Sequence, residues 1–118
     1  AHGSYPKGMI PKLDFERLTL LANTLDIPLV LHGGSGAGEE NIRKAVACGI
    51  NKINVNTDVM AHAVAETGRA LKENPEYGYM DLCMRCEDAM KDFIKSYMRM
   101  IGSSMRYTFG STAGAEFD

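Results

Sequence analysis

The sequence has little net charge and no long hydrophobic run. Its 13 basic and 15 acidic residues leave a formal net charge of −2, and without a basic surface we expect no nucleic-acid partner. No apolar run approaches the roughly 20 residues of a membrane-spanning helix, so we expect no membrane partner. The three cysteines are an odd number in a chain of 118 residues, unlike a secreted disulfide scaffold, which favours a cytoplasmic location.

Hydrophobic residues make up 45% of the chain, which is enough for the core of one domain. Apolar residues at helical spacing predict helices, and short apolar runs that end at glycine or polar residues predict buried parallel strands. The predicted helices are Leu13–Leu25, Glu39–Cys48, Asn56 or Thr57 to about Lys72, and Met80–Ile101. The predicted strands are Pro28–Leu31 and Ile50–Val55.

The order helix–strand–helix–strand–helix indicates an α/β fold. Two parallel strands alone leave their faces and edges uncovered, and a complete (β/α)8 barrel usually needs about 250 residues. We therefore expect the C-terminal portion of a TIM barrel, its last two strand–helix units plus a helical tail. Residues 1–78 would form the end of the barrel with strands seven and eight, and residues 79–118 the C-terminal helix and tail. The N-terminal part of the same barrel would then be a partner.

Two histidines, each followed directly by glycine, lie at candidate strand ends. His2 precedes Gly3, and His32 follows the strand that is predicted to end at Leu31. An isolated histidine is more often a hydrogen-bonded side chain than a metal ligand, and catalytic zinc commonly takes three protein ligands. The shared His-Gly context and the neighbouring loops nevertheless favour a divalent metal here.

Loops suited to a phosphate follow both predicted strands. Gly33-Gly34-Ser35-Gly36 lies between a strand and a helix, where backbone N–H groups and the helix dipole stabilise an anion. Such turns can also serve only to reverse the chain. Asn54 to Thr57 occupies the equivalent place after the next strand, and the loops after strands seven and eight of a barrel often share a phosphate site. Together the loops indicate a phosphorylated metabolite as substrate.

Other notable residues favour structural roles. Cys83 and Cys86 form a CxxC pair inside a predicted helix without a second pair, and His62 lies in a helix without a comparable context. The last helix is expected to pack its apolar face against the barrel or a second subunit and to expose its charges. The apolar residues are Met84, Met90, Phe93, Ile94, Tyr97 and Met98, and the charged ones include Arg85, Glu87, Asp88 and Lys91.

From residue 1 to about residue 70 these motifs closely resemble those of the class II, zinc-dependent ketose-bisphosphate aldolases. The matching stretches are Ala1–Tyr5, Leu13–Leu18, Leu29–Gly36 and Gly49–Asp58. Members of that family are (β/α)8 barrels that reversibly cleave fructose or tagatose 1,6-bisphosphate to dihydroxyacetone phosphate and glyceraldehyde 3-phosphate. The resemblance implies a lyase of glycolysis and gluconeogenesis that acts on fructose 1,6-bisphosphate. The alternatives are a tagatose-bisphosphate aldolase, or a non-catalytic segment that binds phosphate or metal or serves in assembly.

The resemblance also implies roles for single residues. His2 and His32 match two of the three histidines that hold Zn2+, and the same loops can hold a monovalent cation, Na+ or K+, through backbone oxygens. The third zinc histidine and the acid that handles the proton would lie N-terminal to this chain, so we expect no catalytic acid or base here and no activity alone. A homodimer or homotetramer is implied. The substrate-binding positions are Gly3, Gly33, Ser35, Asn54, Val55, Asn56 and Thr57.

Overall fold

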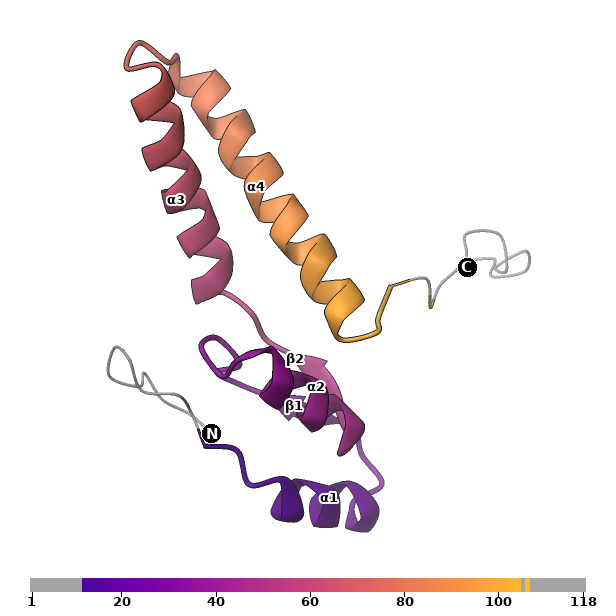
Figure 1. Cartoon of the computed structure of the whole chain (residues 1–118). Helices are drawn as coiled ribbons and strands as arrows, with labels where there is room; N and C mark the ends of the chain where they lie inside the picture. The colour runs from indigo at the N-terminus through magenta and orange to yellow at the C-terminus, as the bar shows by residue number, and fades with distance from the viewer. Residues whose placement is uncertain (1–11, 105, 107–118) are drawn as a thin grey trace, which may run out of the picture.

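The computed structural model describes residues 12–104 and 106 (Figure 1). Every predicted helix and strand within this part of the chain is present. The largest boundary differences are at Leu13, where the first helix instead begins at Phe15, and at Val55, since the second strand already ends at Ile53. The elements are α1 (Phe15–Thr24), β1 (Leu29–Leu31), α2 (Glu39–Ala47), β2 (Ile50–Ile53), α3 (Thr57–Glu73) and α4 (Tyr79–Met100).

The two strands form a parallel sheet, as the α/β pattern predicts. Leu31 is opposite Ile53, and the register shifts once, between Leu29 and Val30. Beyond the end of β2, the Asn54 backbone N–H donates to the Leu31 carbonyl oxygen at 3.1 Å. Parallel strands require a crossover, and α2 provides it. The segments that follow the two strands therefore start at the same edge of the sheet.

The hydrophobic core lies between the sheet and α2. The spacing of Ile42 and Ala45 places both on one side of α2, where they are buried against the strands. The buried core residues are Leu31, Ala37, Ile42, Ala45 and Ile50. The last turns of α4 pack on this core through Tyr97, Met100 and Ile101, and α1 packs on it through Phe15 and Leu18. The C-terminal end of α4 thus packs against the same core as the strands.

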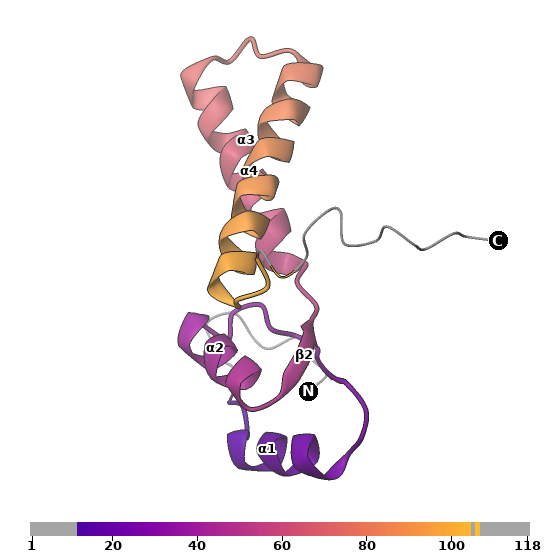
Figure 2. The ribbon, with the colours of Figure 1, turned by 90° about the vertical axis from the view of Figure 1, so that its right-hand side faces the viewer.

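Helices α3 and α4 form a long hairpin that extends away from the sheet (Figures 1 and 2). Phe93 on α4 stacks on His62 of α3, with ring centroids 4.2 Å apart, and the His62 Nδ1–H donates to the Asp58 carbonyl oxygen at 2.7 Å. His62 therefore has a structural role, as its sequence context predicts. None of the helices in the described residues has the length and apolar content to span a bilayer.

The predicted apolar face of α4 divides into two parts. Met90, Phe93 and Tyr97 are half-buried, whereas Met84, Ile94 and Met98 are exposed. The reason is geometric, because α3 and the α/β core together cover only one side of α4, and the exposed residues point to another side. Packing of the exposed residues against the barrel or a second subunit stays a prediction.

Candidate functional site

The edge of the sheet where both strands end brings together two of the predicted site residues. His32 directly follows β1, Asn54 directly follows β2, and the Asn54 Nδ2 atom lies 3.2 Å from the His32 Nδ1 atom. Parallel pairing produces this contact, because it starts both segments at one level of the sheet. His2 and Gly3 lie outside the described residues.

The contact with Asn54 controls which imidazole nitrogen can hold a metal. When the Asn54 amide N–H donates to Nδ1, the proton of a neutral His32 is on Nε2. Rotating the carboxamide by 180° reverses the bond, so that Nδ1–H donates to the amide oxygen and the Nε2 lone pair becomes the ligand. Histidine ligands of metals are usually oriented by such a second hydrogen bond.

His32 therefore fits the role of one metal ligand, and Asn54 fits the role of the hydrogen-bonding group that orients it. Residues 12–104 and 106 contain no cluster of three or more His, Cys, Asp or Glu side chains that could hold a metal ion. A metal at this edge would thus need ligands from outside the described residues, where the predicted ligand His2 lies.

The glycine loop that follows His32 has a backbone shape that side chains disfavour. Gly33 has a φ of 70°, in the left-handed region that glycine adopts without strain. Gly34 is buried, and a Cβ atom there would lie only 3.1 Å from Ile53 Cγ2 at the end of β2. Gly34 therefore lies directly against the end of β2. The next residue of the loop, Ser35, is half-buried.

Two helix N-termini follow the two strand ends. Helix α2 begins after Gly38 and α3 begins after Asn56, and neither has a side-chain hydrogen bond at its N-cap. Backbone N–H groups of a first turn carry a partial positive charge and bind anions well. The predicted residues Asn54 and Val55 are half-buried on the approach to α3, while Asn56 and Thr57 are exposed. Both loops start at the same edge of the sheet.

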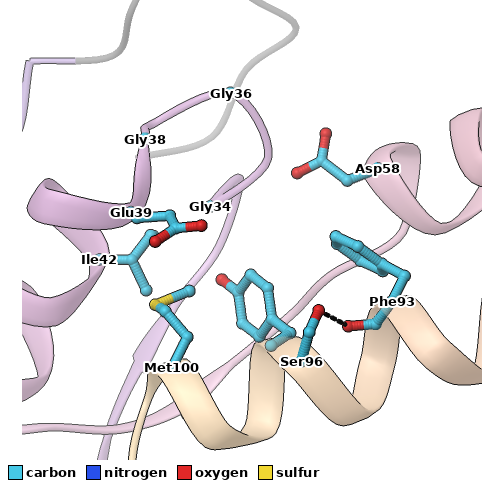
Figure 3. A pocket seen from close by; sticks show the side chains of 10 residues that line it. Gly34, Gly36, Gly38, Glu39, Ile42, Asp58, Phe93, Ser96 and Met100 are labelled. Atoms are coloured by element: carbon cyan, nitrogen blue, oxygen red, sulfur yellow. Dashed lines mark hydrogen bonds between the residues drawn. The ribbon is translucent and has the colours of Figure 1, made fainter.

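A cavity of about 280 Å³ lies on the α4 side of the glycine loop (Figure 3). The carboxylates of Glu39 and Asp58 line it, from the first turns of α2 and α3. These charges disfavour an anion inside the cavity itself. The other lining residues are Gly34, Gly36, Gly38, Ile42, Phe93, Ser96, Tyr97 and Met100.

Tyr97 lines this cavity, although the sequence pattern predicts only a packing role for it. Its hydroxyl oxygen is buried and has no hydrogen-bond partner among the residues that the structure describes. Burial, together with the negative charge of Asp58, raises the pKa of Tyr97, so the group remains a protonated donor. Leaving such a hydroxyl unpaired costs about 1–3 kcal/mol. The one feature of the sequence that could have indicated this hydroxyl is the presence of a tyrosine, a polar aromatic residue, on the apolar face of the last helix.

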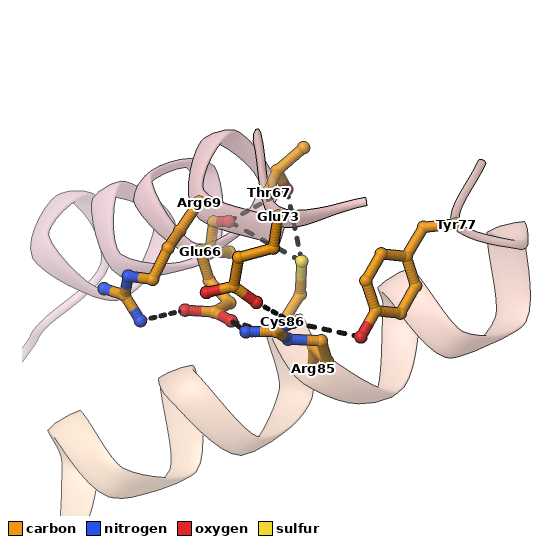
Figure 4. A network of polar contacts seen from close by, with 8 residues as sticks. Glu66, Thr67, Arg69, Glu73, Tyr77, Arg85 and Cys86 are labelled. Carbon is orange, nitrogen blue, oxygen red and sulfur yellow. Dashed lines mark hydrogen bonds and ion pairs between the residues drawn. The ribbon is translucent and has the colours of Figure 1, made fainter. Parts of the chain in front are cut away.

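A second polar cluster lies away from this site, inside the hairpin (Figure 4). Glu66 of α3 is 6% exposed and accepts hydrogen bonds from Arg85 Nε at 2.8 Å and from Arg69. Arg85 also donates to Glu73 at 2.7 Å, which lowers the pKa of Glu73, and to the Tyr77 hydroxyl at 3.1 Å. Arg85 is therefore half-buried and pairs with the buried Glu66 carboxylate, so its predicted place on a solvated face was wrong.

The CxxC pair lies inside α4, as predicted. Cys83 is exposed and Cys86 is half-buried against α3, where its Sγ atom is 3.2 Å from the Thr67 hydroxyl oxygen. Both thiols are free. Cys86 therefore contributes to packing between the two helices, whereas the exposed Cys83 does not.

Fold and site together define an α/β segment that presents an imidazole and a glycine loop at the carboxyl ends of parallel strands. Residues 1–106 match the family described as fructose-bisphosphate aldolase class-II, and the chain belongs to this family. The resemblance drawn from the motifs is thereby confirmed. The family is one of lyases that generally depend on zinc.

A solved structure similar to this chain is the X-ray crystal structure of the YdjI aldolase from Escherichia coli K12. The two share 31% sequence identity and superpose with a TM-score of 0.73. The match covers 83% of this chain and 37% of that protein, so the chain spans well under half of the relative's length.

Proposed function

We propose that this chain is the C-terminal portion of a (β/α)8 barrel in a class II ketose-bisphosphate aldolase. Its substrate would be fructose 1,6-bisphosphate, cleaved reversibly to dihydroxyacetone phosphate and glyceraldehyde 3-phosphate in the cytoplasm. The observation that carries the proposal is the grouping of His32, Asn54 and the glycine loop at one edge of a parallel sheet. Active sites of such barrels lie at the carboxyl ends of the strands.

His32 and His2 would hold two of the three protein positions around a zinc ion. When bound, zinc supplies a Lewis acid for the substrate ketone, so no Schiff-base lysine is needed. Asn54 orients the His32 ring from the side, which selects the nitrogen that faces the metal.

The two loops would bind the phosphate of the dihydroxyacetone phosphate end. In this proposal Gly3, Gly33 and Ser35 contribute from the histidine loops, and the segment from Asn54 through Val55 and Asn56 to Thr57 contributes from the start of α3. Backbone N–H groups at the two helix N-termini supply the positive potential, and backbone oxygens of the same loops can hold Na+ or K+.

The proton on the aldehyde side is assigned to a group outside this chain. We propose that the N-terminal part of the barrel supplies that acid or base and the remaining zinc ligand. The subunit would form a homodimer or homotetramer, and the exposed residues Met84, Ile94 and Met98 of α4 support an interface in the complete protein.

An aldol-cleavage assay on the complete subunit tests the proposal. Cleavage of fructose 1,6-bisphosphate should stop on treatment with a metal chelator and return when zinc is added back. Activity that is unaffected by chelation and accompanied by a lysine adduct trapped with borohydride would overturn it. Faster cleavage of tagatose 1,6-bisphosphate would retain the reaction and change the substrate.

A further inference from the structure

The hydroxyl of Tyr97 lies beside the glycine loop. Its oxygen is 3.7 Å from the position that a Cβ atom on Gly34 would occupy, and it has no hydrogen-bond partner within residues 12–104. A phenylalanine would fill the same space without burying an unpaired hydroxyl. The hydroxyl therefore requires an explanation other than packing.

We infer that Tyr97 is a positioning residue for the glycine loop, its hydroxyl donating a hydrogen bond to a backbone carbonyl of residues 33–35 when an anion binds. This inference rests on the proposed function, because the anion is taken to be the substrate phosphate. Tyr97 does not touch the substrate in this arrangement and acts through the loop.

The planarity of the peptide explains how a hydrogen bond from Tyr97 on one side of the loop favours phosphate binding on the other side. In a trans peptide the C=O and N–H groups point in opposite directions. A carbonyl held from the α4 side directs the N–H of the same peptide away from the cavity. The carboxylates of Glu39 and Asp58 line that cavity and repel an anion there (Figure 3), so the phosphate binds on the opposite side of the loop.

The ring that carries this hydroxyl is held in place by its neighbours. Tyr97 packs on the α/β core, and its ring centroid is 5.8 Å from that of Phe93, which in turn stacks on His62. The donor is therefore fixed before the loop binds its ligand, and little side-chain freedom is lost on binding.

The test is Tyr97→Phe in the complete subunit, with fructose 1,6-bisphosphate as substrate and inorganic phosphate as inhibitor. We expect KM and the phosphate inhibition constant to rise by the same factor, between about twofold and about tenfold, as one neutral hydrogen bond implies. The kcat and the zinc content should stay unchanged, and the melting temperature should not fall. Tyr79→Phe is the matched control, since Tyr79 lies on the same helix and is 79% exposed.

Equal KM and equal phosphate inhibition in the Tyr97→Phe and wild-type proteins would overturn the inference and leave the aldolase proposal standing. A loss of kcat at unchanged KM would also overturn it. If the wild-type protein binds phosphate but cleaves no ketose bisphosphate, the proposed function fails, and the phosphate affinity of the variant still tests Tyr97. If the wild-type protein does neither, both proposals fail.

Discussion

At the scale of single residues, the proposed metal site depends most on His32 as a zinc ligand. In the complete subunit, His32→Ala should remove zinc and nearly all turnover, because the remaining histidines leave the metal under-coordinated. Ser35→Ala should retain zinc and raise KM more than it lowers kcat, since it weakens phosphate binding. Metal analysis and steady-state kinetics separate the two effects. Stoichiometric zinc in the His32→Ala protein would show that the ligand is misassigned.

Asn54 tests the role of the hydrogen bond to the His32 ring. Asn54→Ala should lower the zinc affinity by a factor of about 10–100, the usual effect of removing a supporting partner of a histidine ligand. Asn23→Ala on exposed α1 is a matched control that should leave the affinity unchanged. The measurement is a zinc titration against a competing chelator. An affinity within about twofold of wild type would exclude the orienting role.

The sequence predicted these residues to different extents. His32 was predicted because it directly follows an apolar strand and precedes a glycine. Asn54 was predicted with the loop at the end of the second strand. Their direct contact depends on the parallel register, which brings together residues that are 22 positions apart. The hydroxyl of Tyr97 was missed because its neighbour, Gly34, has no side chain that could signal a contact.

At the scale of elements, the α3–α4 hairpin depends on the pairing of Glu66 with Arg85. Arg85→Met should lower the free energy of opening of the hairpin by about 2–3 kcal/mol, because the buried Glu66 carboxylate keeps only Arg69 as partner. Lys91→Met, which removes exposed pairs on the same helix, should cost at most about 1 kcal/mol. Amide hydrogen exchange of α3 and α4 in the complete subunit measures both.

A double variant provides the control for this prediction. Replacing Glu66 as well as Arg85 with methionine should restore much of the lost stability, since no unpaired carboxylate is then buried. Equal protection of the hairpin amides in wild type and Arg85→Met would contradict a stabilising role of the pair.

The helices and strands themselves could be read from the sequence, whereas their partners could not. Gly49 follows the end of α2, Pro28 directly precedes β1 and Pro75 follows the end of α3. Such boundaries depend on local preferences of the backbone. The half-buried position of Arg85 depends on Glu66, which lies on another helix and 19 positions away in the sequence. Likewise, the exposure of Met84 and Met98 is decided by where α3 lies and by nothing in their own helical spacing.

At the scale of the whole molecule, the sheet of two parallel strands leaves part of its surface uncovered. Val30 of β1 is 43% exposed, although strands of parallel sheets are normally covered on both faces. We therefore predict that the 118-residue chain alone has no aldolase activity. Adding the N-terminal part of the barrel as a separate chain should restore chelator-sensitive cleavage if the two parts assemble. Robust turnover by the isolated chain would refute this prediction.

The most direct measurement is anomalous diffraction at the zinc edge from crystals of the complete subunit. We predict an anomalous peak about 2.0–2.1 Å from an imidazole nitrogen of His32, the distance of a zinc–histidine bond. The Asn54 carboxamide should contact the other ring nitrogen. A zinc peak bound by other residues, with His32 beyond bonding distance, would contradict the assignment of this chain to the metal site of a class II aldolase.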